Sequence, residues 1–503
     1  MGAVRGFGLG SPLGGPDRAA AIVERHRHLT KPLLATGCSW LRLGAVLLVA
    51  ACDSSKPEPP GLSGREVLAL LYESTDGGEW ENNDGWLSDD EIGTWFGVET
   101  DDAGQVVSIA LAGNNLVGTI PPELGSLSSL EYLSLPVNSL TGPIPPELGN
   151  LPSLEDLALW DNALTGPIPP ELGNLSSLED LALWDNSLTG PIPPELGNLS
   201  NLEDLKLDNN PLTGPIPPEL GNLASLDELS LRTNRLTGPI PTELGSLSNL
   251  EYLDLSENSL TGRIPPELGN LSSLEFLSLY YNRLRGLVPT ELGSLSDLEY
   301  LNLDLNSLSG PIPPELGNLV SLEGLSLRSN RLTGPIPPEL GNLSRLEFLE
   351  LSFNSLTRPI PSELGSLSSL EELRLSGNSV TGPIPPELGS LSSLRILWLS
   401  RNSLTGRIPP ELGSLSSLEE LRLSGNFVTG PIPPELGSLW LLDWLDVSEA
   451  SSLWGPLPAE LVGLDLATFR WHGTSLCAPD DPAFLSWLTS IRSHSPPGRW
   501  RCQ

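Results

Sequence analysis

An asparagine returns every 24 residues along most of this chain, with no insertion or deletion between one and the next. The fixed points are Asn114, Asn138, Asn162, Asn186, Asn210, Asn234, Asn258, Asn282, Asn306, Asn330, Asn354, Asn378, Asn402 and Asn426. Nearly all of them close the pattern L-x-x-L-x-L-x-x-N, as in Leu154-Glu-Asp-Leu157-Ala-Leu159-Trp-Asp-Asn162. A unit this short buries its apolar side chains only against copies of itself, so the pattern predicts one elongated stack of coils.

A second phrase fills the other half of each unit, as in Leu140-Thr-Gly-Pro-Ile-Pro145. Together the two phrases resemble the plant-type class of leucine-rich repeat proteins, whose signature is L-x-G-x-I-P. The resemblance covers residues 63–502. It implies an α/β repeat fold: a leucine-rich repeat solenoid of about 15 coils, wound as a right-handed superhelix with a concave parallel β-sheet and a cap at each end. In that class the second phrase adds a second short sheet.

The roles of the side chains within one unit follow from their chemistry. Seven apolar residues are predicted to point inward: Leu140, Ile144, Leu148, Leu151, Leu154, Leu157 and Leu159. The repeated asparagine is predicted to form a buried ladder that bonds the backbone of adjacent coils, because an unpaired buried amide would be costly. Arg358 replaces the glycine of the L-T-G step, which indicates that this position does not always need positive φ. Ala450 replaces the next asparagine and marks the end of the regular array, residues 106–449.

The amino-terminal segment has the composition of an export signal. Residues 1–51 contain six Lys or Arg and end in an uncharged apolar run, which predicts a signal peptide. Val49-Ala50-Ala51-Cys52 resembles the lipobox of bacterial lipoproteins, which implies cleavage before Cys52 and lipidation of its thiol. An ordinary cleaved signal is the alternative. Residues 52–62 would then be the lipidated cysteine and a flexible tether. The prediction is an exported protein, lipid-anchored to the cell envelope in the periplasm or at the cell surface.

Each end of the array needs a cap, because the first and last coils would otherwise expose an apolar edge. Residues 63–105 are predicted to form the amino-terminal cap, opened by the capping box Ser63-Gly-Arg-Glu66. Trp80, Trp86 and Trp95 are interpreted as its core and not as a ligand site. Trp95-Phe-Gly-Val98 resembles the W-x-G-V of plant-type caps, although Gly93 and Thr100 stand where those caps have cysteines.

The carboxyl-terminal cap is predicted over residues 450–503, with a helix after the N-cap Asp481 and with Pro482 at its first position. Cys477 and Cys502 flank this helix. Cys38 is lost with the leader and Cys52 is lipidated, so these two cysteines are the remaining pair in an exported protein. They are predicted to form a disulfide.

Ligand-binding candidates come from the strand positions between the leucines, which project from the concave face in this architecture. The candidates are Tyr132, Asp156, Trp160, Asp161, Asp180, Trp184, Asp185, Asp204, Lys206, Asp208, Tyr252, Phe276, Tyr280, Tyr281, Tyr300, Arg374, Trp398 and Arg422. They divide into an acidic strip with two stacked tryptophans, an aromatic middle, and three residues expected to form a cation–π ladder. Exposed aromatic and arginine side chains are typical of binding hot spots. They also pair well across a sheet for structural reasons alone.

No catalytic chemistry is visible, because the repeats contain neither His nor Cys. No spacing matches a calcium loop, and we predict neither a metal nor a cofactor. The formal charge of −36 disfavours nucleic acid as a partner. The sequence predicts a non-catalytic recognition or scaffold protein that binds a protein or peptide on the concave face and contacts the membrane only through its lipid anchor. Carbohydrate or cell-wall binding through the aromatic residues, and a plant receptor-like ectodomain, are the alternatives.

Overall fold

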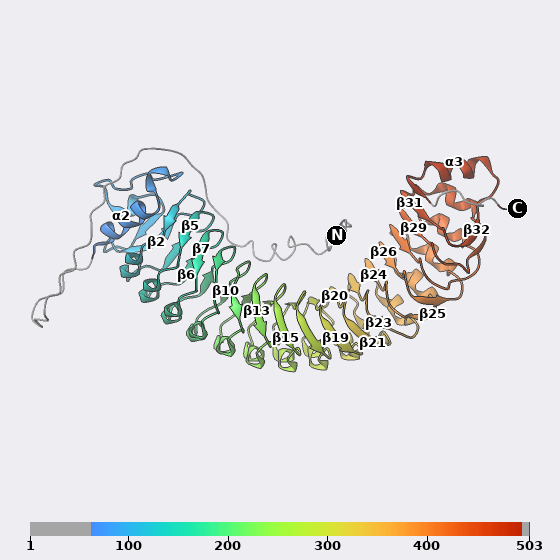
Figure 1. Ribbon diagram of the computed structural model, residues 1–503, viewed down its shortest axis with the longest axis horizontal. Coiled ribbons are helices and arrows are strands. Elements are labelled where there is room, and N and C mark those ends of the chain that lie inside the picture. Colours follow the sequence, from blue (N-terminus) through green and yellow to red (C-terminus); the bar gives the residue numbers. More distant parts are fainter. Residues whose placement is uncertain (1–61, 495–501, 503) are drawn as a thin grey trace, which may run out of the picture.

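The computed structural model describes residues 62–494 and 502, so the predicted leader, the tether and Cys52 lie outside the described residues. The coils lie side by side in one long arch with a cap at each end (Figure 1). No helix within the described residues is both long and apolar enough to cross a membrane.

One long parallel sheet runs through every coil. Its strands are β2 (Val106–Ala110), β4 (Tyr132–Ser134), β6 (Asp156–Ala158), β8 (Asp180–Ala182), β10 (Asp204–Lys206), β12 (Glu228–Ser230), β14 (Tyr252–Asp254), β16 (Phe276–Ser278), β18 (Tyr300–Asn302), β20 (Gly324–Ser326), β22 (Phe348–Glu350), β24 (Glu372–Arg374), β26 (Ile396–Trp398), β28 (Glu420–Arg422) and β29 (Trp444–Asp446). These fifteen strands agree with the predicted number of about 15 coils. Within residues 62–494 the same sheet continues into the caps, through β31 (Thr468–Arg470) and β33 (Ser493–His494) at one end and the antiparallel β1 (Val98–Thr100) at the other. Neighbours pair with an offset of one unit, as in Asp156 opposite Asp180.

The predicted second sheet is present as several shorter sheets on the L-T-G phrases. These strands are β3 (Val117–Thr119), β5 (Ser139–Gly142), β7 (Ala163–Gly166), β9 (Ser187–Leu188), β11 (Thr213–Gly214), β13 (Arg235–Gly238), β15 (Ser259–Gly262), β17 (Arg283–Gly286), β19 (Ser307–Gly310), β21 (Arg331–Gly334), β23 (Ser355–Leu356), β25 (Thr381–Pro383) and β27 (Ser403–Thr405). The second sheet breaks between β23 and β25, where Arg358 stands. Arg358 has a φ of 68°, so the expectation that this position escapes positive φ was wrong. The coil imposes the left-handed conformation, and the arginine bears the strain.

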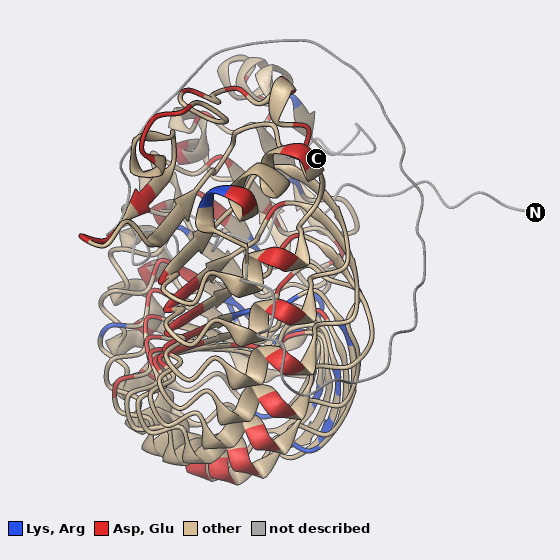
Figure 2. Ribbon diagram, turned by 90° about the vertical axis from the view of Figure 1, so that its left-hand side faces the viewer, with Lys and Arg blue, Asp and Glu red and all other residues tan. Residues whose placement is uncertain are grey.

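A short 3-10 helix closes each coil on the side away from the long sheet. These helices are η3 (Pro122–Ser126), η4 (Pro146–Asn150), η5 (Pro170–Asn174), η6 (Pro194–Asn198), η7 (Pro218–Asn222), η8 (Thr242–Ser246), η9 (Pro266–Asn270), η10 (Thr290–Ser294), η11 (Pro314–Asn318), η12 (Pro338–Asn342), η13 (Ser362–Ser366), η14 (Pro386–Ser390), η15 (Pro410–Ser414), η16 (Pro434–Ser438) and η17 (Ala459–Gly463). Figure 2 shows one acidic residue repeating along this row of helices. In η8 a Cβ on Gly245 would lie 2.3 Å from the carbonyl oxygen of Glu267 in the next coil. Glycine there lets adjacent coils approach closely.

The core is a continuous column of leucine and isoleucine, and all seven residues predicted to point inward are buried. The asparagine ladder is confirmed. The side-chain oxygen of Asn258 accepts a hydrogen bond from the backbone N–H of Leu236 at 2.9 Å. Its amide donates to the carbonyl oxygens of Leu231, in the preceding coil, at 2.9 Å and of Leu255 at 3.3 Å. Each asparagine therefore links two coils through groups that would otherwise be unpaired in the core.

The amino-terminal cap begins with α2 (Gly64–Ser74), and its predicted capping box between Ser63 and Glu66 is present. Two short helices, η1 (Gly77–Glu79) and η2 (Ile92–Thr94), lead to β1 (Val98–Thr100), which pairs antiparallel with β2. Trp80, Trp86 and Trp95 are buried, and their rings pack in sequence with centroids 4.7 and 5.3 Å apart. Their interpretation as cap core is confirmed.

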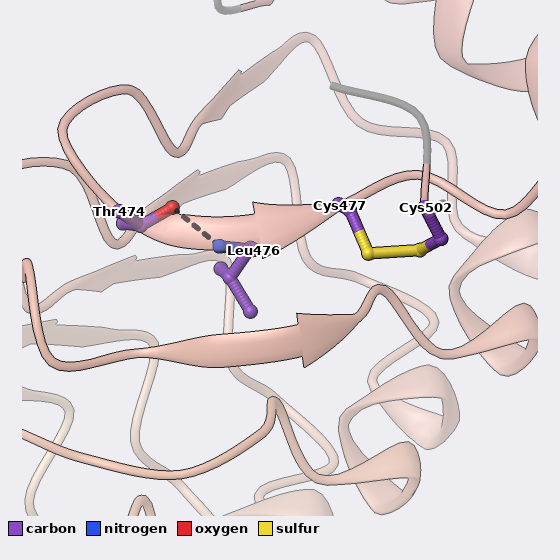
Figure 3. Close-up of a disulfide and its surroundings, with 4 residues drawn as sticks. All are labelled: Thr474, Leu476, Cys477 and Cys502. Carbon is purple, nitrogen blue, oxygen red and sulfur yellow. Dashed lines mark hydrogen bonds between the residues drawn. A yellow bond between two sulfur atoms is a disulfide. The ribbon is translucent and has the colours of Figure 1, made fainter. Parts of the chain in front are cut away.

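The carboxyl-terminal cap contains β30 (Trp454–Pro456), β31 (Thr468–Arg470), β32 (Ser475–Cys477), α3 (Pro482–Ser490) and β33 (Ser493–His494). Asp481 caps α3 by accepting a hydrogen bond from the backbone N–H of Phe484 at 2.8 Å, as predicted. The predicted disulfide joins Cys477, at the end of β32, to Cys502 (Figure 3). It fixes the end of the chain to the last coils.

Candidate functional site

The solvent side of the long sheet, called here the sheet face, offers one set of side chains per coil. In a strand such as β6, Leu157 points into the core, while Asp156 and Ala158 on either side of it point to the solvent side because side chains alternate along a strand. Neighbouring strands lie roughly 4.8 Å apart. Residues at the same position of successive coils therefore form rows along the solenoid, and each row can be treated as a continuous surface.

The first part of the sheet face is acidic. A cavity of about 160 Å³ lies over β4 to β10, lined by Tyr132, Glu155, Asp156, Glu179, Asp180, Glu203 and Asp204. The strand segments of these four coils, residues 131–137, 155–161, 179–185 and 203–209, contain ten carboxylates and a single basic residue, Lys206. The structure thus brings together Tyr132, Asp156, Asp180 and Asp204 of the predicted site.

Burial changes the protonation of this cluster. Burial raises the pKa of Asp156 to about 6 and that of Asp180 to about 7, with the charge of Lys206 opposing both shifts. Burial alone would lower the pKa of Lys206, but the carboxylates of Glu228 and Asp204 outweigh it and raise that pKa. The Lys206 ammonium lies 2.9 Å from Asp204 and 3.0 Å from Glu228. Lys206 is therefore held as a cation between two adjacent strands.

Two aromatic stacks stand on the same face. The rings of Trp160 and Trp184 are 4.4 Å apart and inclined by 8°, which confirms the predicted tryptophan stack. Phe276 lies between Tyr252, at 4.4 Å, and Tyr300, at 5.4 Å, with all three rings close to parallel. Each stack covers the ring faces that its members turn toward one another, so a ligand meets mainly ring edges and the outermost faces.

The predicted cation–π ladder is present and is longer than predicted. It contains Phe348, Arg374, Trp398, Arg422, Trp444 and Arg470, in chain order on the strands from β22 to β31. Arg422 lies 4.2 Å from the ring centroid of Trp398 and 4.4 Å from that of Trp444. The ladder was predicted from the last position of each strand alone, whereas Phe348 and Trp444 stand at the first position of theirs. Arg470 does stand at the last position, but Asp446 interrupts that row between Arg422 and Arg470.

The arginines of this ladder already have acidic partners. Arg374 lies 2.7 Å from Glu372, and both side chains are only 10% exposed. Arg422 lies 2.7 Å from Glu420, whose other contact is the indole N–H of Trp398 at 2.8 Å. Arg374 and Arg422 thus have carboxylate partners and cover ring faces of the ladder, although the Nε of each arginine is buried and makes no hydrogen bond within the described residues. The ladder links the last coils to one another.

Other predicted residues are placed elsewhere or are occupied. Asp161, Asp185 and Tyr281 lie in the turn after their strands with φ between 51° and 53°, and they do not line the cavity. Tyr280 packs against Tyr281 at 5.9 Å, beside the three-ring stack. Asp208 accepts hydrogen bonds from Ser230 and from the backbone of Arg232 in the next coil, which is a structural role.

The sequence reading missed a row of functional candidates immediately before the predicted positions. Glu155, Glu179 and Glu203 line the cavity, yet they directly follow the first leucine of the pattern and were not included among the outward positions. The signal that could have found them is a carboxylate at the same place in nearly every unit, from Glu131 to Glu371. Because the strands are only three residues long, the residue before each strand also reaches the sheet face.

Two family models match the chain. The model described as Leucine Rich Repeat matches residues 129–151, 153–175, 177–199, 201–223 and 417–439. The model described as Leucine-rich repeat region matches residues 234–358 and 279–424. No curated protein sequence matches this chain.

Solved structures give closer relatives. The plant peptide hormone receptor RGFR1, in complex with RGF2, is 33% identical over 77% of this chain and 70% of that chain, with a TM-score of 0.61. A leucine-rich repeat protein of Leptospira interrogans is 34% identical over 76% of this chain and 94% of that chain, with a TM-score of 0.61. The leucine-rich repeat ectodomain of the membrane receptor kinase GASSHO1/SCHENGEN3 from Arabidopsis thaliana, in complex with Casparian strip integrity factor 2, is 33% identical over 86% of this chain and 61% of that chain, with a TM-score of 0.56.

The stacked coils, the asparagine ladder and the open sheet face define a capped solenoid. The chain belongs to the leucine-rich repeat family.

Proposed function

We propose that this protein is a non-catalytic recognition protein that binds an extended segment of a protein or peptide along its sheet face. The observation that carries the proposal is the contrast between a constant core and a face whose chemistry changes along its length. That face is acidic over β4 to β10, aromatic over β14 to β18, and self-paired from β22 onward. An elongated ligand can contact all three of these regions at once.

The solved relatives support this proposal. Two of those described above were determined in complexes, one as a peptide hormone receptor with RGF2 and the other with Casparian strip integrity factor 2. The Leptospira interrogans protein shows that the same fold also occurs in a bacterium. A plant receptor-like ectodomain is the second reading of the fold, but Gly93 and Thr100 in place of the cap cysteines favour the bacterial one.

Carbohydrate binding through Trp160 and Trp184 is the other candidate. A sugar stacks on an open ring face. Because these two rings stack on each other, their inner faces are covered, and only the outer faces could hold a sugar. The geometry therefore favours a peptide, whose side chains can also use the ring edges and the neighbouring carboxylates.

The proposal can be tested with a random dodecapeptide library displayed on phage and panned on the purified protein. Enriched peptides should lose binding to the variant Tyr252→Ala/Tyr300→Ala. They should keep binding to Trp440→Ala, which removes an aromatic side chain that is 69% exposed but lies off the sheet face, just after η16. A glycan array is run in parallel. Enrichment of glycans with no enrichment of peptides would contradict the proposal.

We also propose that the mature protein is exported and anchored through a lipid on Cys52. The support is the sequence Val49-Ala50-Ala51-Cys52 behind an apolar run. Two or three acyl chains on one residue give stable anchoring. In a bacterial host, Cys52→Ser should move the protein from the membrane fraction to the soluble fraction. Mass spectrometry that finds residue 52 unmodified would contradict the anchor.

A further inference from the structure

One lysine shows how a cation is held on the sheet face. The ammonium of Lys206 bridges Asp204 and Glu228, which are register partners on β10 and β12. In the row of Lys206, the residues of the two preceding coils are Ala182 and Ala158. These coils therefore have the carboxylate pair without a cation of their own.

The carboxylate pair concerned is Asp156 and Asp180, register partners on β6 and β8. Each of them has a buried side-chain oxygen, Oδ1, that makes no hydrogen bond within the described residues. Leaving such an atom unpaired costs free energy, and this cost falls when a donor arrives. Both residues line the cavity over β4 to β10 and are only partly buried, so a cation in the cavity approaches the open side of each carboxylate while Oδ1 stays covered.

The charge around this pair is strongly one-sided. The four strand segments of β4 to β10 carry ten carboxylates and only Lys206 as a cation. By contrast, residues 371–377, 395–401, 419–425 and 443–449 carry seven carboxylates and four arginines, and two of those arginines lie 2.7 Å from their acidic partners. The coils of β4 to β10 therefore have few cations for their carboxylates, whereas the coils of β24 to β29 contain several arginines. Complementarity thus calls for a basic partner over β4 to β10.

The stacked rings of Trp160 and Trp184 stand four residues further along the same two coils. Lysine and arginine have apolar stems that pack on aromatic surface while the charged head reaches an acid, and a guanidinium also interacts with a ring face. The two rings do not line the cavity itself, but they belong to the coils that supply Asp156 and Asp180. Acidic and aromatic groups on the same two coils suit a long cationic side chain better than a metal ion, which would use only the carboxylates.

We propose that the sheet face over β4 to β10 binds a lysine- or arginine-bearing extended segment of a partner protein, with one cationic side chain seated between Asp156 and Asp180. This inference rests on the proposed function and names the chemistry of the partner. The bound cation takes the place that the side chain of Lys206 occupies two coils later. Nucleic acids and anionic membrane surfaces are repelled by the same carboxylates.

The test uses the purified full chain and three blocked decapeptides as probes: one with alternating lysine and glycine, one with alternating glutamate and glycine, and one of serine and glycine. Binding is measured by isothermal titration calorimetry in 150 mM salt, roughly physiological ionic strength. The lysine peptide should bind at least tenfold more tightly than the other two. Asp156→Asn/Asp180→Asn should weaken its binding at least tenfold.

The matched control is Glu171→Gln/Glu195→Gln. It removes the same number of carboxyl groups from exposed residues of η5 and η6, on the side away from the sheet. It should weaken binding less than threefold. A second variant, Ala182→Lys, places an internal ammonium beside the pair and should also abolish binding while leaving the fold intact by circular dichroism.

Equal losses in the asparagine variant and the glutamine control would overturn the proposal, because binding would then follow net charge alone. Unchanged binding by Ala182→Lys would also overturn it. A third outcome separates the two proposals. If library peptides still depend on Tyr252 and Tyr300, while Asp156→Asn/Asp180→Asn leaves the affinity for the lysine peptide unchanged, this inference fails and the proposed function stands.

Discussion

At the scale of one residue, Asp180 shows how burial and neighbouring carboxylates disfavour the charged form of a carboxyl group on the sheet face. The groups around it are Asp156, Asp204, Glu228 and the single cation Lys206. Burial raises its pKa to about 7, and an equivalent effect raises the pKa of Asp304 to about 7. A carboxyl with a raised pKa keeps a proton in the folded state that the unfolded chain releases at lower pH. Folding stability from such groups therefore falls as pH rises from about 4 to about 7.

The melting temperature should accordingly rise when the pH is lowered from 8 to 5.5. The variant Asp180→Asn/Asp304→Asn should melt higher than the natural chain at pH 8 and should lose part of this pH dependence. Differential scanning calorimetry at several pH values measures both effects. Glu171→Gln, on exposed η5, is the control for the change in net charge. A pH profile that both variants leave unchanged would contradict the assignment.

The asparagine ladder allows a second prediction at the residue scale. Asn258→Ala removes one acceptor from the backbone N–H of Leu236 and a donor from the carbonyl oxygen of Leu231, both in the core. Each buried group left unpaired costs about 1 to 3 kcal/mol. The midpoint of urea unfolding should therefore fall clearly. Asn201→Ala, which removes an exposed hydrogen bond to Ser176, should have little effect. Equal effects would contradict the structural role of the ladder.

At the scale of one element, the 3-10 helices decide how closely coils stack. A Cβ at Gly245 of η8 would lie 2.3 Å from the carbonyl oxygen of Glu267, whereas a Cβ at Gly463 of η17 meets no atom within 4 Å. Gly245→Ala should therefore destabilise the array by about 1 to 3 kcal/mol. Gly463→Ala should be neutral or slightly stabilising, because alanine suits a helix better. Thermal melts of the two variants test this pair, and equal melting temperatures would contradict it.

The elements also show what the sequence could predict. The L-x-x-L-x-L-x-x-N phrase determined the strands, the inward leucines and the asparagine bonds, because each depends only on local periodicity and on the next copy. The φ of Arg358 was predicted wrongly. The prediction used only the preference of arginine for negative φ, and the sequence does not reveal that neighbouring coils force the backbone into the left-handed conformation here. The antiparallel strand β1 was not predicted, because it lies outside the repeats and no periodic pattern marks it.

The candidate site was predicted less completely than the fold. Trp160, Trp184 and the centre of the cation–π ladder were found because they stand at repeated outward positions. Which of these side chains remain available to a ligand was not predictable, because it depends on side-chain orientation: the partner of an arginine can stand on its own strand, as Glu372 does beside Arg374, or on a neighbouring strand. Arg374 and Arg422 proved to lie 2.7 Å from Glu372 and Glu420. No basic residue in the described part of the chain forms an ion pair with Asp156 or Asp180, and each of these two keeps an oxygen without a hydrogen bond there. Among the same described residues, the Nε of each arginine also lacks a hydrogen bond.

At the scale of the whole molecule, stability depends on contacts between successive coils, because the main contacts of each coil within residues 62–494 are with the coils next to it. The ends should therefore open first. The disulfide between Cys477 and Cys502 closes a segment of 25 residues, and a loop of this size contributes about 3 kcal/mol by chain entropy. Reduction should speed amide hydrogen exchange in residues 450–494 before it affects the central coils. The variant Cys477→Ser/Cys502→Ser should exchange fast with or without reductant, and uniform exchange along the chain would contradict a local cap.

The unbroken period has a consequence for how such a protein changes over generations. The stretches 154–169 and 178–193 are nearly identical and lie one unit apart. Recombination between their coding sequences adds or removes one whole coil while every hydrogen-bonded neighbour finds an equivalent replacement. The binding surface can thus lengthen or shorten in steps of about 4.8 Å with both caps retained. The length of the sheet face can therefore change over generations while the fold stays the same.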